Sequence, residues 1–213
     1  MIDWNDAFDN SSYVVGSKSL ESNLLKKATD FRKLVNNDGF SQFDIRYGVK
    51  ERCTFDIFKA KKHPEMIIIF IHGGYWHQLS KNHWSHLANA AYKNDLGFAI
   101  PSYTLAPNAT LKEITEEIAL FLEFLSNKVS SRFILVGHSA GGHLVTRMNC
   151  ESSKLRVEVR NRILKTISIS GIYDLQPIMH TKLNDILGLD ADVAKSESPV
   201  FLAPTSKGNL IFW

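Results

Sequence analysis

The chain has 213 residues, of which 44% are hydrophobic, and its formal net charge is +3. This content is enough for one sizeable hydrophobic core, so we expect a single domain over residues 1–213. The 25 Lys and Arg residues are scattered among 22 Asp and Glu residues, which argues against a nucleic-acid partner. The sequence has no apolar run of about 18 residues and no basic-then-apolar start, so neither a membrane partner nor a secretion signal is predicted.

Cysteine usage points to a reducing compartment. Cys53 and Cys150 are the only cysteines in the sequence. Two cysteines this far apart are more typical of reduced thiols than of a disulfide framework. Together with the missing export signal, this predicts a cytoplasmic protein.

Helix and strand patterns alternate in the first half of the chain. A helix is predicted over residues 21–35, followed by strands at 43–47 and 54–58, where alternating polar and apolar residues indicate half-exposed strands. The continuous apolar run at 66–71 predicts a strand buried on both faces, and residues 82–94 predict a second helix. The expected buried sides of the two helices are Leu24, Leu25, Ala28, Phe31, Leu34 and Val35 in the first, and Trp84, Leu87, Ala88 and Ala91 in the second.

The second half continues the same alternation. A strand at 96–100 is expected to end before Pro101, and Thr110 with Glu113 forms a capping-box pattern that opens a helix. The buried face of that helix is expected to contain Leu111, Ile114, Ile118, Phe121, Leu122 and Leu125, with Glu113, Glu116, Glu117 and Glu123 mostly outward. Further strands are predicted at 133–136 and 163–170, and another begins at 209–213. Strands separated by helices predict an α/β fold with a mostly parallel sheet and helices on both faces.

The segment Gly-His-Ser-Ala-Gly at 137–141 lies between a predicted strand and a helix-like stretch at 142–148. In that context the serine occupies a sharp turn that lifts its hydroxyl clear of the backbone. Glycines flank it because the turn needs close approaches and backbone angles that other residues resist. Ser139 is therefore the predicted nucleophile, and His138 is expected to be a structural neighbour.

The strand at 66–71 is followed by His-Gly-Gly-Tyr-Trp at 72–76. A tetrahedral intermediate in acyl transfer needs backbone N–H donors aimed at its oxyanion. One donor is expected from Ala140, directly after the nucleophile, and the other from the upstream glycine loop, in which Gly73 and Gly74 allow close approach. His72 is expected to orient this loop rather than to act as a base.

Other side chains near these motifs have less specific patterns. Aromatic rings can hold an acyl or aryl group by stacking, although core packing is an equal alternative for Tyr103. The candidates for such a substrate pocket are Tyr75, Trp76 and Tyr103. The spacing of His77, His83 and His86 fits no strong metal pattern, and the last two fit a solvated helix side. Neither a metal nor another cofactor is predicted.

Several segments together resemble the α/β-hydrolase superfamily and, within it, the kynurenine formamidase (arylformamidase) group and its bacterial relatives. These segments are Trp4 with the acidic, asparagine-containing stretch after it, and residues 72–76, 101–107 (Pro-Ser-Tyr-Thr-Leu-Ala-Pro), 137–144 and 170–177 (Ser-Gly-Ile-Tyr-Asp-Leu-Gln-Pro). The resemblance implies hydrolysis of N-formylkynurenine to kynurenine and formate through an acyl-enzyme on serine. The implied partner is a small formamide or ester, and a homodimer stays possible.

The resemblance leaves the catalytic triad incomplete. In the superfamily the order is nucleophile, acid, histidine. The resemblance puts the acid just after the strand that begins at Asn209 and the histidine further on, so both are expected beyond Trp213. We therefore expect a C-terminally truncated α/β-hydrolase domain that lacks its last strand or strands. Such a domain has an open apolar sheet edge, with Leu210, Ile211, Phe212 and Trp213 exposed on it.

Two residues inside the chain could in principle replace the missing pair. Asp174 and His180 satisfy the order after Ser139. They are only six residues apart, however, and His180 is expected on a helix, which makes contact with the Ser139 hydroxyl difficult. Asp174 is better interpreted as an acceptor in a turn.

Three interpretations follow from the residues and the resemblance. The chain is either an arylformamidase-like amidohydrolase, a carboxylesterase of the His-Gly-Gly type, or an inactive fragment without its triad acid and histidine. The same nucleophile and oxyanion hole serve amides and esters, so these motifs do not separate the first two interpretations.

Overall fold

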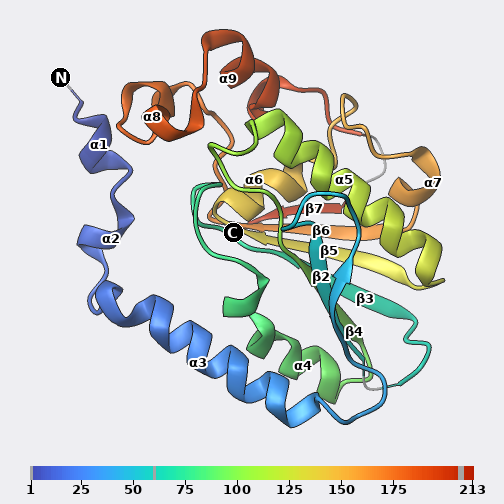
Figure 1. Ribbon diagram of the computed structural model, residues 1–213. Helices are drawn as coiled ribbons and strands as arrows, with labels where there is room; N and C mark the ends of the chain where they lie inside the picture. The colour runs from blue at the N-terminus through green and yellow to red at the C-terminus, as the bar shows by residue number, and fades with distance from the viewer. Residues whose placement is uncertain (1, 60, 206–208) are drawn as a thin grey trace.

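The computed structural model describes residues 2–59, 61–205 and 209–213 (Figure 1). Within these ranges the sheet has seven strands in the order β1-β2-β4-β3-β5-β6-β7. The β1–β2 and β2–β4 pairs are antiparallel, and the remaining pairs are parallel, which confirms the predicted mostly parallel sheet. The strands are β1 (Gln42–Arg46), β2 (Thr54–Phe58), β3 (Met66–Ile71), β4 (Gly97–Pro101), β5 (Arg132–His138), β6 (Ile163–Ile169) and β7 (Asn209–Phe212).

Helices cover both faces of this sheet, as predicted: α5 and α6 lie above it in Figure 1 and α3 and α4 below it. The α-helices are α1 (Trp4–Ala7), α2 (Asn10–Tyr13), α3 (Ser17–Val35), α4 (Ala88–Lys93), α5 (Leu111–Lys128), α6 (Ala140–Arg147), α7 (Val157–Arg160), α8 (Asn184–Leu187) and α9 (Ala191–Glu197). Short 3-10 turns are η1 (Lys81–His83), η2 (Ser85–Leu87), η3 (Pro177–His180) and η4 (Pro199–Phe201). Among the helices described, none combines the length and apolar character that a bilayer crossing requires.

Two hydrophobic clusters, one on each face, hold the helices to the sheet. Side chains alternate along a strand, so Ile67, Ile69 and Ile71 of β3 join the cluster that contains α5 and α6. Phe70 belongs to the opposite cluster with α3 and α4, and Ile68 packs against that cluster. The prediction that this strand is buried on both faces is confirmed.

The first long helix differs from its prediction in extent and in burial. It begins at Ser17 rather than at residue 21, and its buried residues are Ala28, Phe31 and Val35. Leu25 and Leu34 are 43% and 77% exposed, so their predicted burial is wrong. The physical reason is that α3 packs along η1 and η2 outside the sheet layer, and this contact covers only a narrow side of the helix.

The predicted helix at 82–94 is also broken. Two 3-10 turns, η1 and η2, precede α4, and Leu87 is 37% exposed although burial was predicted. The Ser80 backbone N–H donates to Nδ1 of His83 at 3.2 Å, and this local capping holds the first turn in the tighter 3-10 form.

Strand β2 is buried, and the predicted half-exposed pattern there is wrong. Both of its faces are covered, because Phe55 and Ile57 belong to the cluster that contains α5, and Phe58 belongs to the opposite cluster that contains α3. The polar residue that suggested exposure, Asp56, is fully buried, and its carboxylate pairs with the ammonium group of Lys81 at 2.8 Å and also with Arg32. A buried charge is tolerated when it is paired in this way.

Helix α5 follows its prediction closely. The Thr110–Glu113 capping box is present, and the predicted apolar face is buried. Glu117 is the exception to the outward acidic residues: it is buried, and its carboxylate accepts the Thr104 backbone N–H at 2.7 Å and pairs with Lys50 at 3.1 Å.

Strand β7 forms the last edge of the described sheet, beside β6. Its pairing extends through Trp213, whose N–H donates to the Ser168 carbonyl at 2.9 Å and whose carbonyl accepts the Ser170 N–H at 2.6 Å. The Trp213 side chain is nevertheless 85% exposed, and Ile211 and Phe212 are exposed as well, which agrees with the predicted open apolar edge. Leu210 differs from that prediction. It is only partly exposed, and it lines a pocket together with Thr146 of α6 and Tyr173.

Candidate active site

Ser139 occupies a strained turn between β5 and α6. Its backbone angles are φ 54° and ψ −120°, a region that residues with a side chain seldom adopt. Its N–H donates to the Ile169 carbonyl at 2.9 Å, which fixes the turn against β6. A Cβ on Gly137 would be 2.1 Å from the Gly141 carbonyl oxygen, and one on Gly141 would be 2.0 Å from that of Ile71. Both positions therefore require glycine for this close packing.

The glycine loop after β3, residues 72–79, passes directly beside this turn. A Cβ on Gly73 would be 3.0 Å from the Ser139 Cβ and 2.7 Å from the His138 carbonyl oxygen. The loop is strained, with φ values of +111° at Gly74, 46° at Tyr75, 59° at Trp76 and 68° at Leu79. The structure thus brings Gly73 next to Ser139.

Ala140, the third predicted oxyanion residue, directly follows Ser139 as the first residue of α6. Its backbone is therefore on the same turn as the candidate nucleophile, across from the glycine loop. The three predicted oxyanion residues come from the two segments that meet at Ser139.

His72 is fully buried at the start of the loop. Its Nδ1 donates to the Gly73 carbonyl at 2.7 Å, because a carbonyl oxygen can only accept. Burial lowers the pKa of His72 to about 3, so the ring is neutral near pH 7. The ring stacks on Tyr103 with centroids 4.4 Å apart, and the Tyr103 hydroxyl donates to the His72 carbonyl at 3.0 Å.

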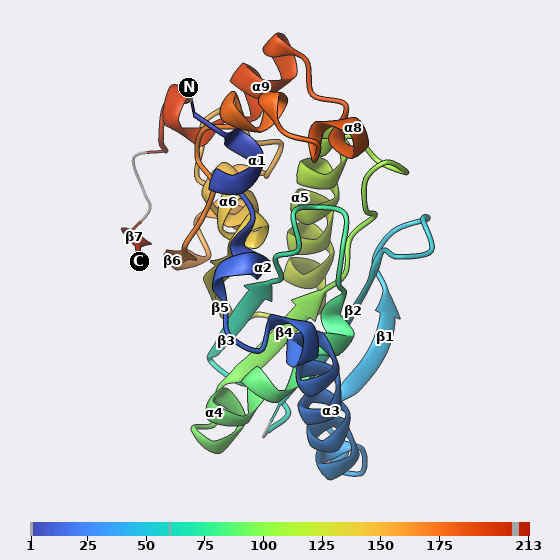
Figure 2. The same ribbon diagram turned by 90° about the vertical axis from the view of Figure 1, so that its left-hand side faces the viewer.

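Of the three aromatic pocket candidates, only Tyr75 reaches an open cavity. This cavity, of about 870 Å³, is bounded by α1, α2, the start of α3, Tyr75, His138 and Ser170. Figure 2 shows α1 and α2 as a strip across this side of the molecule. The side chains of Trp76 and Tyr103 are fully buried and do not line this cavity.

Trp76 packs edge-to-face against His143 of α6, with ring centroids 5.2 Å apart. His143 is fully buried, and its Nε2 donates to the Glu197 carbonyl at 2.8 Å. Burial lowers the pKa of His143 to about 3, so this histidine is neutral as well. The glycine loop and the helix after Ser139 are thereby packed together through two rings.

The in-chain acid and base candidates make other contacts. The Asp174 carboxylate accepts the Gln176 backbone N–H at 2.9 Å, as an acceptor in a turn does. His180 is exposed and stacks on Trp4 with ring centroids 6.4 Å apart. Within the ranges 2–59, 61–205 and 209–213, no histidine or carboxylate forms a hydrogen bond with the Ser139 hydroxyl.

Three further histidines lie in or after the glycine loop, at positions 77, 83 and 86. The prediction that His83 lies on a solvated helix side is wrong, because its side chain is only 12% exposed. His86 is partly buried too, and burial lowers the pKa values of His77 and His86. Among the residues that the structure describes, no group of three or more His, Cys, Asp or Glu side chains is arranged to hold a metal ion.

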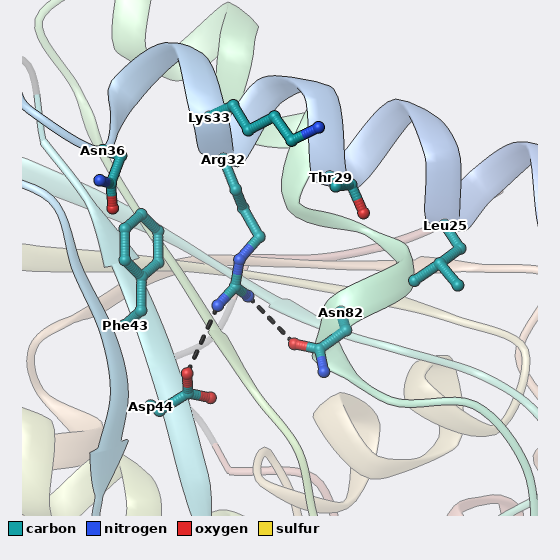
Figure 3. Close-up of a pocket in the computed structure, with 8 residues that line it drawn as sticks. All are labelled: Leu25, Thr29, Arg32, Lys33, Asn36, Phe43, Asp44 and Asn82. Carbon is teal, nitrogen blue, oxygen red and sulfur yellow. Dashed lines mark hydrogen bonds and ion pairs between the residues drawn. The ribbon is translucent and has the colours of Figure 1, made fainter.

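A second cavity, of about 580 Å³, lies between α3, β1 and η1 (Figure 3). Arg32 projects into it from α3, donates to the Asn82 side chain at 3.0 Å and pairs with Asp44 at 3.5 Å. Since Arg32 also pairs with the buried Asp56, its charge is already compensated inside the protein. No residue of the glycine loop or of the turn at Ser139 lines this second cavity. The cavity lined by Tyr75 of the glycine loop and by His138, the residue before Ser139, is therefore the candidate active site.

Comparisons with known proteins identify the family of this chain. A family model, BD-FAE, matches residues 55–205. The chain belongs to the BD-FAE family. A kynurenine formamidase from Danio rerio is 30% identical over 179 residues, which cover 82% of this chain and 60% of that protein. The chain thus spans less than two thirds of the length of this relative.

Solved structures place this BD-FAE chain among the α/β-hydrolases. A crystal structure from Silicibacter sp. TM1040, of a protein provisionally assigned as a thioesterase, superimposes with a TM-score of 0.94 at 33% identity, covering 100% of this chain and 80% of the other. An esterase from Pyrobaculum calidifontis has a TM-score of 0.67 at 14% identity, covering 92% and 73%. The predicted α/β-hydrolase fold and the resemblance to kynurenine formamidases are confirmed.

Some contacts of this candidate site carried no sequence signal. Arg52 belongs to a segment without a recognisable motif, and although His143 and Phe8 lie in segments that carry the resemblance, nothing there indicated that they contact the glycine loop. The contact of His143 was the most predictable of the three. His143 lies in the first turn of α6, and the helix after the nucleophile must pack on the loop after β3.

Proposed function

We propose that the full-length protein is a serine hydrolase that cleaves an aryl formamide through an acyl-enzyme on Ser139. The observation that carries this proposal is the strained turn at Ser139 with Gly73 packed against it. Strained backbone conformations persist where the surrounding structure holds them, and they cluster at active sites. The similarity to kynurenine formamidases supports a formamide as substrate.

In the first step the Ser139 hydroxyl oxygen bonds to the formyl carbon, and its proton passes to a general base. The developing oxyanion accepts hydrogen bonds from backbone N–H groups of the glycine loop and of Ala140. Collapse of the tetrahedral intermediate breaks the C–N bond, and the base returns the proton to the departing aryl amine. Water then attacks the formyl ester, the base takes one proton from this water, formate leaves, and Ser139 regains its proton.

The base in this proposal is a histidine beyond Trp213, oriented by a carboxylate that also lies beyond Trp213. Two observations support this. No histidine in the described part of the chain bonds to the Ser139 hydroxyl, and the chain spans 60% of the length of the Danio rerio relative. The 213 residues alone, on this proposal, have only residual activity, because nothing accepts the serine proton during attack.

The cavity beside Ser139 supports a substrate with an aromatic ring. Tyr75 lines this cavity, and the cavity volume of about 870 Å³ is in the range typical of small-molecule sites, about 300–1,000 Å³. Stacking on a tyrosine contributes about 0.5–1.5 kcal/mol beyond the free energy of the area it buries.

We also propose a cytoplasmic location, which the free, buried thiols of Cys53 and Cys150 support.

An ester or thioester is the second candidate substrate. The observation in its favour is the 33% identity to the Silicibacter protein provisionally assigned as a thioesterase. The proposed nucleophile and oxyanion donors serve all three bond types, because each passes through the same kind of tetrahedral intermediate.

The test compares substrates on the full-length protein and on its Ser139→Ala variant. Formylkynurenine, p-nitrophenyl acetate and an acyl thioester are assayed, and both proteins are exposed to a fluorophosphonate probe. We expect kcat/KM to be highest for formylkynurenine, and both turnover and labelling to disappear in the variant. Undiminished labelling of Ser139→Ala would reject the nucleophile, and a preference for the ester or thioester would replace the formamide.

A further inference from the structure

The glycine loop at residues 72–79 holds an unfavourable backbone conformation. Tyr75, Trp76 and Leu79 all have positive φ values although none is glycine. Such a conformation is unfavourable for a residue with a side chain and persists only where its surroundings impose it. The contacts at the two ends of the loop therefore matter for the position of the Gly73 and Gly74 N–H groups between them.

One side chain, Arg52, holds the far end of the loop. It comes from the segment between β1 and β2, and its Nη2 donates to the Leu79 carbonyl at 2.7 Å. Its Nε donates to the Tyr103 carbonyl at 2.9 Å. The same guanidinium thus connects the end of the loop to the segment that follows β4.

Tyr103 carries this connection to the start of the loop. Its ring stacks on His72, and its hydroxyl donates to the His72 carbonyl at 3.0 Å. The contacts Leu79–Arg52–Tyr103–His72 therefore join both ends of the loop through two side chains. Gly73 and Gly74 lie between the joined ends.

Arg52 has no carboxylate partner within salt-bridge distance among the described residues. Partial burial lowers its pKa from the ordinary value, and the two carbonyl oxygens are the hydrogen-bond acceptors its guanidinium has there. The contacts of this half-buried guanidinium therefore serve to connect two backbone segments, the end of the glycine loop and the segment after β4.

We propose that Arg52 is a positioning residue that holds the glycine loop in the conformation required for oxyanion binding. The inference rests on the proposed function, since it assigns the Gly73 and Gly74 N–H groups to the oxyanion. Arg52 itself does not touch the substrate; it acts through Leu79 and Tyr103.

The chain contains a matched control in Arg162. This half-buried arginine also donates to backbone carbonyls, those of Ser126 at 2.7 Å, Val129 at 2.6 Å and Ser131 at 3.1 Å. These carbonyls precede β5, so they lie at the end of the sheet opposite to Ser139. Both arginines brace a loop, but only Arg52 braces the one beside the candidate nucleophile.

The experiment compares Arg52→Lys with Arg162→Lys in the full-length protein. Lysine keeps the positive charge, but it lacks the planar guanidinium group whose separate N–H donors reach two carbonyl oxygens. We expect both variants to lose similar thermal stability, while only Arg52→Lys lowers kcat, by about 10–100-fold, with KM within about 2-fold. Loss of one oxyanion donor lowers kcat by about 100–1,000-fold, and a displaced donor should cost less.

Hydrogen exchange of the loop amides provides a readout that does not depend on hydrolysis. We expect faster exchange at residues 73–79 in Arg52→Lys and unchanged exchange there in Arg162→Lys. Equal kcat values in the two variants, or unchanged loop exchange in Arg52→Lys, would overturn the proposal. If Arg52→Lys does not fold, Tyr103→Phe removes only the hydroxyl bond to His72, and the same two measurements decide.

The proposed function and the positioning role of Arg52 can be rejected independently of each other. Full activity in Ser139→Ala would reject the serine mechanism, whereas faster loop exchange in Arg52→Lys would still show that Arg52 holds the loop. Activity that depends on Ser139 but not on Arg52 would reject the positioning role alone.

Discussion

The Tyr75 hydroxyl donates a hydrogen bond of 2.7 Å to the Phe8 carbonyl oxygen. This bond connects the glycine loop to the segment that carries α1 and α2, 67 residues earlier in the sequence. A second contact holds the same segment, since the Lys182 backbone N–H donates to the Asn5 side chain at 2.7 Å. The N-terminal segment is thus fixed across the cavity beside Ser139.

Tyr75→Phe is expected to raise KM by about 2–10-fold and to change kcat little. It removes one hydrogen bond, worth about 1 kcal/mol, so the N-terminal wall of the cavity becomes less ordered while the loop glycines stay in place. Steady-state kinetics with the full-length protein measures both constants. The control is Tyr92→Phe, which removes a tyrosine hydroxyl on α4 that does not line this cavity; a similar KM increase in the control would contradict the connecting role of Tyr75.

Gly74→Ala is expected to lower kcat by at least about 10-fold, because a displaced oxyanion donor stabilises the transition state less. Gly74 has a φ of +111°, and an added Cβ would be 2.4 Å from the Gln78 carbonyl oxygen, so the loop must move. Gly39→Ala is the matched control: its φ is +77°, but no atom lies within 4 Å of an added Cβ. Both variants should lose about 1 kcal/mol of stability from backbone strain, and normal turnover in Gly74→Ala would show that another segment binds the oxyanion.

His180→Ala is expected to keep more than about half of the wild-type kcat/KM. His180 is exposed and stacks on Trp4, and it has no hydrogen bond to Ser139. Removal of a true triad histidine costs about 10⁴–10⁶-fold, so the two cases are easily separated by a turnover assay. A loss of that size would move the base into the 213 residues, and Asp174→Asn would then test the acid.

The buried histidines predict a loss of stability in acid. The pKa of His143 is lowered by burial from 6.5 to about 3. Between these pH values the unfolded chain binds a proton at this site and the folded chain does not. The free energy of unfolding is therefore highest above pH 6.5 and falls as the pH decreases toward 3, by up to about 1.4 kcal/mol per pH unit for this residue.

Urea unfolding of His143→Gln across pH 4–7 measures this contribution. The glutamine amide can still donate to the Glu197 carbonyl, but it does not titrate, so the slope of stability against pH should decrease by about one proton. The exposed His63→Gln serves as the control. An unchanged slope in His143→Gln would mean that the ring takes up a proton in the folded state.

The sequence alone predicted the strand–turn–helix around Ser139, the glycine loop and the mostly parallel sheet. These features depend on neighbours along the chain: the glycines beside Ser139 allow a local close approach, and the apolar run of β3 requires burial on both faces. The capping box at Thr110 is of the same kind, because its two hydrogen bonds join residues three apart.

Only the tertiary structure decided which side chains hold these motifs in position. Arg52 meets Leu79 and Tyr103, and Phe8 meets Tyr75, across separations that no local pattern encodes. The same holds for burial: Asp56 looked like the polar position of a half-exposed strand, and it is buried because Lys81, from a distant turn, supplies the opposite charge. Hydrophobic periodicity predicts burial from the polarity of each residue and its neighbours along the chain. A long-range hydrogen bond or ion pair that permits a polar residue to be buried exists only after the chain has folded and both partners are in contact.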